Sequence, residues 1–362
     1  MFTWPSIRFL RKSGFVSKKR DFVVIHATEF SLFLFVWKSM DKLLQNQIGG
    51  IYKMEMLVSL LLLSLGFAML VKGADWFVDG SSGIAKRFGI PQLIIGLTIV
   101  AMGTSAPEAA VSITAAIKEN ADITVGNIVG SNILNVLIIL GISSMITPLV
   151  VSRSTISHEI PFMIFITLLL LVQGLNGRIG RFEGVILALI FVLYLGYLFW
   201  TSKKEKESDT AVPKEYRLWQ SVLGTIAGLV MIVSGSNVAV DAASTVARIL
   251  GMSERFIGLT IVALGTSLPE LVTSVSAARK GNADIAIGNI VGSNIFNILF
   301  VLGLSAMITP IPFSVGFYMD TVVAALAGVL LLACSLRYCK LSRFSGILMV
   351  TGYLLYFIFI CI

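Results

Sequence analysis

The hydrophobic positions of the chain form a series of long apolar stretches, which from residue 56 onward are separated only by short polar breaks. A transmembrane helix needs about 20 mostly apolar residues, so the pattern predicts about ten spans. The predicted spans are residues 57–84, 91–117, 122–146, 156–174, 182–201, 218–247, 253–278, 284–308, 314–336 and 343–361. The sequence therefore predicts an all-α integral membrane protein.

The apolar pattern and the polar residues within it occur twice. Residues 96–149 realign with residues 258–311 at a constant offset of 162 residues, with most positions identical, and upstream Asp79 aligns with Asp241. Each copy lies in a half with five predicted spans. Because five is odd, equivalent helices cross the membrane in opposite directions, as in the inverted repeats of secondary transporters. Duplication for helix packing alone would not explain why polar residues are identical in both copies.

The repeat and the breaks between spans divide the chain into four parts. They are an N-terminal extension, a first five-helix repeat, a cytoplasmic loop and a second five-helix repeat, at residues 1–53, 54–201, 202–217 and 218–362. The apolar stretch of the extension is short for a span. Gly49 and Gly50 are encoded by GGN codons, which resemble a bacterial ribosome-binding site ahead of Met54. We therefore expect translation in the cell to start at Met54.

Composition and charge narrow the class of protein. Hydrophobic residues make up 56% of the chain and charged residues 13%, with a mean hydropathy of +0.90, which leaves too few charges to cover a soluble globule. The net charge is +8, but the basic residues lie in short connections and not on one amphipathic face, which disfavours nucleic-acid binding. Lys and Arg are concentrated in alternate connections, so the positive-inside rule places the 201–217 loop in the cytoplasm and both ends of the ten-span unit outside. We expect a multi-pass protein of the inner (plasma) membrane.

One predicted helix of each copy is interrupted near its middle. The sequences are Ala-Met-Gly-Thr-Ser-Ala-Pro-Glu at residues 101–108 and Ala-Leu-Gly-Thr-Ser-Leu-Pro-Glu at residues 263–270. Proline lacks an amide hydrogen and clashes with the carbonyl four residues back, which frees carbonyls around Gly103 and Gly265. Irregular backbone at membrane depth is tolerated only where it lines a cavity or binds a ligand. The two interruptions are therefore candidate binding segments.

The glutamate that ends each interrupted segment needs a partner. An ionised side chain at the bilayer centre costs about 2.5 to 3.5 kcal/mol even on the lenient scale, and the predicted spans place no Lys or Arg at the depth of Glu108 and Glu270. A bound cation or a proton remains as the partner. Two neutral glutamates that are merely hydrogen-bonded would be the structural alternative.

The following helix of each copy carries Gly-Asn-Ile-Val-Gly-Ser-Asn-Ile-x-Asn, at residues 126–135 and 288–297. Its serine and last asparagine are four apart and share one helical face, which can point at the glutamate of the preceding helix; these residues are Ser131, Asn135, Ser293 and Asn297. Small residues four apart let helices approach closely, so packing is the expected role of Gly126, Gly130, Gly288 and Gly292. The asparagines off that face are expected to pack or to gate, and these are Asn127, Asn132, Asn289 and Asn294.

All the candidate donors around the two glutamates are oxygen atoms. They are carboxylates, amide oxygens, freed backbone carbonyls and the hydroxyl groups of Thr104, Ser105, Thr266 and Ser267. Six to eight oxygen ligands in flexible geometry suit Ca²⁺, and carboxylate and carbonyl ligands suit hard cations generally. A zinc or copper site would want histidine or cysteine ligands, and the only histidines are His26 and His158.

At these motifs the sequence resembles the calcium/cation antiporter superfamily of sodium/calcium exchangers, prokaryotic type, over residues 54–362. The resemblance implies two inverted five-helix halves and exchange of Na⁺ or H⁺ against Ca²⁺ by alternating access. The ion ligands that it implies are Glu108, Glu270, Thr104, Ser105, Thr266, Ser267, Ser131, Ser293, Asn135 and Asn297, with backbone oxygens of Ala101 and Ala263. Several members carry aspartate at the position of Asn297, which leaves the coupling stoichiometry open. The central loop is too short for a calcium-sensing domain.

Three functions compete at this point. Sodium-driven calcium transport is the leading one, a proton-coupled calcium antiporter would use the same glutamates, and a passive cation channel would not need a duplicated occluded site. An enzyme is the weakest candidate class, because no nucleophile and base pair accompanies the glutamates. We expect no cofactor and no obligate protein partner, with inorganic cations and the lipid bilayer as the interacting species. Asp79 and Asp241, near span ends, are not expected to bind the ion.

Overall fold

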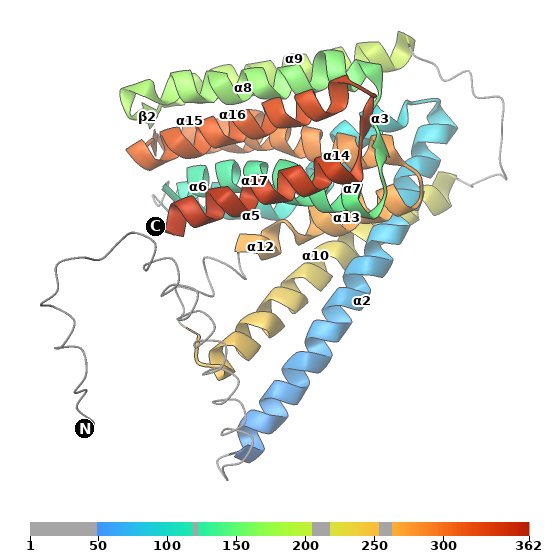
Figure 1. Cartoon of the computed structure of the whole chain (residues 1–362), viewed down its shortest axis with the longest axis vertical. Helices are drawn as coiled ribbons and strands as arrows, with labels where there is room; N and C mark the ends of the chain where they lie inside the picture. The colour runs from blue at the N-terminus through green and yellow to red at the C-terminus, as the bar shows by residue number, and fades with distance from the viewer. Residues whose placement is uncertain (1–48, 119–121, 205–217, 253–262, 362) are drawn as a thin grey trace, which may run out of the picture.

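The computed structural model describes residues 49–118, 122–204, 218–252 and 263–361, and it is almost entirely helical (Figure 1). The prediction of an all-α protein is therefore confirmed. The N-terminal extension, which bears on the predicted translation start at Met54, lies mainly outside the described residues. Most of the predicted cytoplasmic loop lies outside them as well.

The helices of the first half are α2 (Gly49–Phe88), α3 (Gln92–Ile95), η1 (Gly96–Val100), α4 (Ala101–Thr104), α5 (Ala106–Ile117), α6 (Asp122–Leu134), η2 (Asn135–Leu140), α7 (Gly141–Ile146), η3 (Thr155–Glu159), α8 (Ile160–Gln173), η4 (Gly174–Asn176) and α9 (Arg181–Lys204). Those of the second half are α10 (Leu218–Ile249), α12 (Ala263–Thr266), α13 (Leu268–Arg279), α14 (Ala283–Phe296), η6 (Asn297–Leu302), α15 (Gly303–Ile308), α16 (Val315–Leu336) and α17 (Arg343–Cys361). Four two-residue strands join the halves, namely β1 (Leu149–Val150), β2 (Arg178–Ile179), β3 (Ile311–Pro312) and β4 (Lys340–Leu341).

The lengths and apolar composition of the helices fit a membrane. Within the described residues, eight helices are long and apolar enough to span a bilayer, and a ninth span is formed by the bent pair Gln92–Thr104 and Ala106–Ile117. These nine coincide with nine of the ten predicted spans. The first part of the remaining span, at 253–262, lies outside the described residues, so the count of ten stays a prediction.

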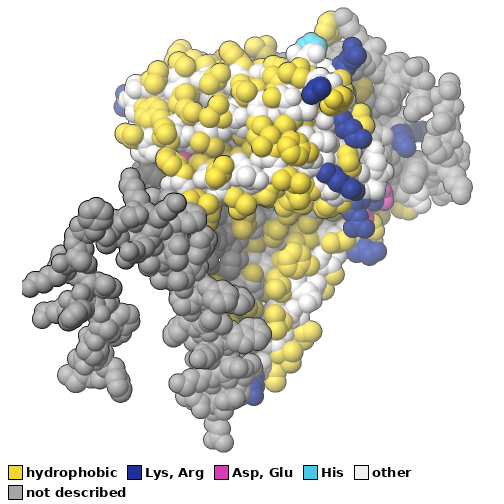
Figure 2. Space-filling view, in the orientation of Figure 1, with side chains coloured by type: hydrophobic (Ala, Val, Ile, Leu, Met, Phe, Trp, Pro, Cys, Tyr) yellow, Lys and Arg dark blue, Asp and Glu magenta, His cyan; other side chains and the backbone are white. Residues whose placement is uncertain are grey.

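The outer surface also fits a membrane protein. Large hydrophobic side chains are exposed along the helices, while Lys and Arg gather at one end of them (Figure 2). The last turn of α2 carries Lys86 and Arg87, and the last turn of α13 carries Arg279. We call this end the basic face, and the end at which α10 finishes, beside Arg248, the opposite face. The gathering of basic residues at one end agrees with the charge asymmetry expected from the sequence.

The sequence repeat is also a structural repeat. The π-helical segments η2 and η6, the short helices α7 and α15, and the strand pairs β1/β3 and β2/β4 are each related by the offset of 162 residues. Strands pair across the halves, since β1 is antiparallel to β4 and β2 is antiparallel to β3. The two halves therefore interlock. Their opposite orientation in the membrane stays a prediction.

Helices α2 and α10 form a pair that extends away from the other helices (Figure 1). Glycines seven residues apart on α2 lie against the backbone of α10: a Cβ on Gly66 would be 2.9 Å from the carbonyl oxygen of Gly235, and a Cβ on Gly73 would be 2.9 Å from that of Gly228. Such close approach needs small residues at the contact. The pair therefore packs backbone to backbone along a stripe of glycines.

The glycine contact predicts a large effect of a bulky side chain at residue 73. We expect Gly73→Leu to lower the Tm of the purified protein by about 2–5 °C, because overpacking against backbone costs about 1–3 kcal/mol. The measurement is thermal unfolding in detergent. The matched control is Gly196→Leu, because a Cβ on Gly196 meets nothing within 4 Å and the Tm is expected to stay the same. Equal Tm values for the two variants would contradict the packing.

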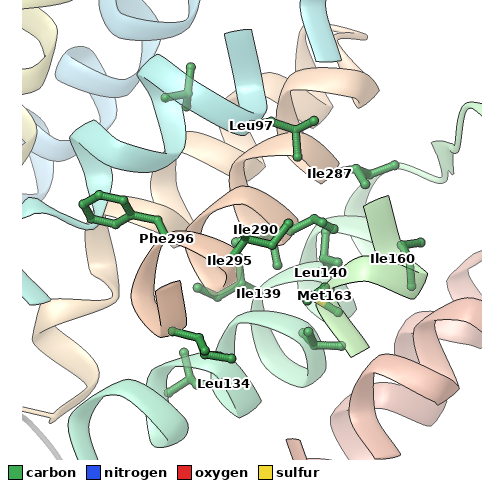
Figure 3. Close-up of a cluster of buried hydrophobic side chains, with 14 of the residues drawn as sticks. Leu97, Leu134, Ile139, Leu140, Ile160, Met163, Ile287, Ile290, Ile295 and Phe296 are labelled. Atoms are coloured by element: carbon green, nitrogen blue, oxygen red, sulfur yellow. The ribbon is translucent and has the colours of Figure 1, made fainter. Parts of the chain in front are cut away.

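The central helix of the molecule is the continuous segment α14–η6–α15. Of an apolar 18-residue stretch within this span, 94% is buried inside the protein, and Ile287, Ile290 and Ile295 pack among side chains of η1, η2 and α8 (Figure 3). Gly288 and Gly96 face each other with a Cβ of either residue 3.1 Å from the α-carbon of the other. The packing role predicted for Gly288 is therefore confirmed. Around Gly130 no such contact occurs among the described residues, and residues 258–262, the repeat equivalents of η1, lie outside them.

Candidate ion-binding site

The interruption of the first copy is a bend between α4 and α5. The segments Gln92–Thr104 and Ala106–Ile117 meet at 51°, with Ser105 at the corner at φ −81° and ψ 7°, and Pro107 in the first turn of α5. The second copy bends at Ser267 in the same way, with φ −91° and ψ 3°. The predicted broken helices are therefore present, and each places its glutamate in the first turn of the following helix, where backbone N–H groups and the helix dipole favour negative charge.

The two glutamates are buried and are bonded across the repeats. Glu108 and Glu270 each have 1% of their surface exposed. The Ser105 hydroxyl donates to Glu270 Oε1 at 2.8 Å, and the Ser267 hydroxyl donates to Glu108 Oε1 at 3.4 Å. Each corner serine thus binds the glutamate of the other half, so the N-terminal ends of α5 and α13 meet.

Four oxygens of the predicted ligand set have no partner. In the part of the chain that the structure describes, Oε2 of both glutamates and Oδ1 of both Asn135 and Asn297 are buried without a hydrogen bond. A buried polar atom left unpaired costs about 1–3 kcal/mol. Helix α5 contacts η6, which begins at Asn297, and α13 contacts η2, which begins at Asn135. The unpaired oxygens therefore belong to neighbouring elements and suit a cation between them.

A pair of asparagines holds the amide groups of Asn135 and Asn297. Asn135 Nδ2 donates to Asn294 Oδ1 at 3.0 Å, and Asn297 Nδ2 donates to Asn132 Oδ1 at 3.2 Å. Asn132 and Asn294 donate in turn to each other's backbone carbonyls, at 3.2 and 3.1 Å. Because the NH₂ groups of Asn135 and Asn297 are engaged, their oxygens are the free ends. Sequence reasoning assigned Asn132 and Asn294 only to packing or gating and missed this orienting role.

Asn127 and Asn289 stabilise the helices that carry the glutamates, α5 and α13, by hydrogen bonds. Asn127 Nδ2 donates to the backbone carbonyl of Glu108 at 3.3 Å and to Ser112 Oγ at 2.9 Å. Asn289 Nδ2 makes the equivalent bonds to the carbonyl of Glu270 at 3.4 Å and to Ser274 Oγ at 2.9 Å. Each pair of bonds fixes the helix turn that carries a glutamate. The packing role expected for this pair agrees with these contacts.

The other predicted ligands occupy the periphery of the site. Thr104 is buried and donates to Asn289 Oδ1 at 3.0 Å, and Ser293 donates to the carbonyl of Ala101 at 3.4 Å. That carbonyl also accepts the backbone N–H of Ser105 at 3.0 Å. Ser131 is buried on α6 and Thr266 is half-buried at the end of α12. Ala263 is the first residue of α12, and its surroundings lie outside the described residues.

The carbonyl freed by the second proline has a partner on α10. Pro269 leaves the Gly265 carbonyl without its helical donor, and the Ser236 hydroxyl donates to that carbonyl at 2.8 Å. Freed carbonyls were predicted as possible ligands of the ion. This one is bonded within the protein, and it links α10 to the broken helix.

A cleft of about 780 Å³ connects the site to the opposite face. It lies between α5 and α10, with Pro107, Val111 and Asp241 in its walls, and it reaches Gly265 and Thr266. On the basic face a groove of about 580 Å³ lies beside α2, α7 and α13, but it contains none of the predicted ligands. Among the described residues, no group of three or more His, Cys, Asp or Glu side chains is placed to hold a metal. The site thus consists of two acids with amide and hydroxyl groups around them. A cleft reaches it from the opposite face.

The fold and site define a multi-pass membrane protein with a duplicated, buried cluster of polar, oxygen-rich side chains. The model of the family described as "Sodium/calcium exchanger protein" matches residues 58–200 and again residues 220–362. The chain therefore belongs to the sodium/calcium exchanger family, and the resemblance seen in its motifs is confirmed.

Individual relatives agree with this assignment. The chain is 40% identical over 300 residues to CaxA of Alkalimonas amylolytica, named as a candidate antiporter, which covers 81% of this chain and 94% of CaxA. It is 35% identical over 312 residues to the inner membrane protein YrbG of Escherichia coli, covering 83% and 96% of the two chains. The solved structure of the sodium-calcium exchanger NCX_Mj matches with a TM-score of 0.74 and 31% identity, over 83% of this chain and 98% of that one.

Proposed function

We propose that this protein is a secondary antiporter that exchanges Na⁺ for Ca²⁺ across the membrane by alternating access. The observation that carries the proposal is the set of four buried, unpaired oxygens contributed by two carboxylates and two amides. Membership of a transporter family and the likeness to a sodium-calcium exchanger support it, and they favour transport over enzymatic chemistry.

The charge and chemistry of the site fit the proposed cargo. Two carboxylates carry the charge that one Ca²⁺ or two Na⁺ would neutralise, and oxygen-only ligands suit hard cations. The proposed ligands are those predicted from the sequence, with Glu108, Glu270, Asn135 and Asn297 at the centre. Ser105 and Ser267 hold one oxygen of each glutamate, which leaves the other oxygen to the ion. The cations are cargo, and we propose no resident cofactor.

The cleft on the opposite face supports alternating access over a channel. A channel needs a continuous path, whereas here the cleft reaches the site from the opposite face and the groove on the basic face contains none of its residues. By the positive-inside rule the basic face is cytoplasmic, which makes this conformation open to the outside. The relationship to an inner membrane protein of Escherichia coli supports a location in the inner (plasma) membrane.

Tracer calcium uptake into sodium-loaded proteoliposomes tests the proposal. We expect ⁴⁵Ca²⁺ uptake when external Na⁺ is replaced by choline, and loss of the uptake when Na⁺ is equal on both sides. Uptake that follows an imposed pH gradient without Na⁺ would identify the proton-coupled antiporter. Calcium flux that needs no counter-ion would identify a channel, and either result would overturn sodium/calcium exchange.

A further inference from the structure

Helices α2 and α13 are joined on the basic face by one lysine. Lys280, at the end of α13, places its Nζ 2.8 Å from Asp79 Oδ1 and 3.5 Å from Asp75 Oδ1, and it donates to the backbone carbonyl of Asp75 at 2.8 Å. The Ser276 hydroxyl also donates to Asp75 Oδ1, at 2.7 Å. The ammonium group thus has three oxygen atoms of α2 within 3.5 Å. This cluster ties the α2–α10 pair to the helix that carries Glu270.

The repeat equivalents of this cluster lie on the opposite face and are not joined. With the offset of 162 residues, Lys280 corresponds to Lys118, Asp79 to Asp241 and Asp75 to Asn237. Within the described residues, no ion pair joins Lys118 to Asp241. Asp241 and Asn237 instead line the cleft that reaches the ion site. The ion pairs of Lys280 therefore lie on the basic face, where the groove contains none of the predicted ligands, and among the described residues their repeat equivalent is missing beside the cleft that reaches the site.

A second pair of equivalent residues shows the same asymmetry in burial. Val111 on α5 lines the cleft and is 42% exposed, whereas its equivalent Thr273 on α13 is 0% exposed. In inverted-repeat transporters the two halves exchange conformations during the cycle. Exchange of conformations here would expose Thr273 to the basic face, bury Val111, break the Lys280 contacts and bring Lys118 to Asp241.

We propose that Lys280 is a positioning residue for exchange: with Asp75 and Asp79 it forms a latch that holds the protein closed on the basic face, and Lys118 with Asp241 forms the alternate latch when the protein is closed on the opposite face. The two latches differ in strength, because Asn237 stands where the first latch has Asp75. The conformation open to the opposite face is therefore the favoured one without ions. This proposal builds on the exchange function but concerns the balance of conformations, which is measurable without transport.

Labelling of a cysteine at residue 273 tests the latch. In full-length protein with Cys334, Cys339 and Cys361 changed to serine, the rate at which Thr273→Cys reacts with a membrane-impermeant maleimide from the basic face reports the population open to that face. We expect Lys280→Met to raise this rate about fivefold, the size expected for a partly exposed pair of charges. Lys280→Arg, which keeps the charge, is expected to stay within about twofold of the parent.

A substitution of Asn237, which lines the cleft, provides an independent test. Asn237→Asp supplies the missing second carboxylate of the alternate latch, and it is expected to raise labelling of Thr273→Cys about threefold. Lys118→Met is expected to lower it. Unchanged labelling in Lys280→Met and Asn237→Asp, with Tm values equal to the parent, would overturn the latch. Altered labelling in a protein without sodium-driven calcium uptake would leave the latch standing and refute exchange instead.

Discussion

Replacement of Glu108 or Glu270 by glutamine is expected to reduce sodium-driven calcium uptake to the background of empty vesicles. Each change removes one of the two negative charges at the centre of the proposed site. A unit charge about 4 Å from a cation contributes roughly 4 kcal/mol per unit of cation charge at an effective dielectric of about 20, or about 8 kcal/mol for Ca²⁺, so we expect a loss of calcium affinity of at least about a thousandfold.

The hydrogen bonds of the site make glutamine a poor substitute. Oε1 of each glutamate accepts a hydrogen bond from the corner serine of the other half, so a glutamine would keep its oxygen there. Its NH₂ group would then take the place of the unpaired Oε2 and direct donor hydrogens toward the cation. The loss therefore combines a missing charge with a group of the wrong polarity.

Calcium binding measured by calorimetry in detergent, together with uptake in proteoliposomes, checks this expectation. Glu159→Gln is the matched control, since Glu159 is also buried but is bonded to the Tyr194 hydroxyl at 3.0 Å, away from the broken helices. The control variant is expected to bind calcium as the parent does. Near-normal calcium affinity in both Glu108→Gln and Glu270→Gln would place the ion site elsewhere.

Much of the fold follows from the sequence because membrane spans are set by local rules. Nine of the predicted spans match helices of the structure within a few residues, since each depends only on a continuous apolar stretch. The bends were predictable as well, because Pro107 and Pro269 remove backbone hydrogen bonds at known positions. The glycine contacts between α2 and α10 were not predicted, because the sequence does not show which helix Gly66 and Gly73 face.

The two glutamates at the centre of the site were predictable for an energetic reason, but the hydrogen bonds between the two halves were not. A glutamate at membrane depth needs a partner wherever the chain folds, which identifies Glu108 and Glu270 from sequence alone. The serine of one half bonding the glutamate of the other depends on how the halves interlock. Asn297 likewise donates to Asn132 of the other repeat. The repeat itself was the signal that such crossed pairs exist, because identical polar residues in two copies can bond reciprocally.

The reciprocal bonds also give the site a mechanical character. The glutamates and asparagines of both halves are tied together by Ser105, Ser267, Asn132 and Asn294, so the ligands form one unit with α5, α6, α13 and α14. The α2–α10 pair packs along a stripe of glycines, and its polar links to this unit include the Lys280 cluster and the Ser236 bond to Gly265. Movement of the pair past a rigid ligand unit would open one face and close the other without dismantling the site.

Replacement of Asn297 by leucine is expected to lower calcium affinity by about 10- to 100-fold while the protein still folds. Leucine has a similar volume but removes the unpaired Oδ1, and a polar contact to a charged group contributes about 1.5–3 kcal/mol. Asn135→Leu, the equivalent change in the other half, is expected to give a similar loss. The loss is smaller than for the glutamates because the amide carries no net charge.

Two further variants separate a ligand from its support. Asn132→Leu keeps the oxygen of Asn297 but removes the Oδ1 that accepts from its amide at 3.2 Å, so the oxygen is present without a fixed direction. We expect a loss of affinity intermediate between the parent and Asn297→Leu. Asn127→Leu is the comparison, because Asn127 donates to Ser112 and to the backbone carbonyl of Glu108 and supplies no proposed ligand; we expect it to lower the Tm and to reduce the affinity less than Asn297→Leu. All four variants are compared by calcium titration and thermal unfolding in the same detergent. Parent-like calcium affinity in Asn297→Leu, or a larger loss in Asn132→Leu than in Asn297→Leu, would show that the amide oxygen does not bind the ion.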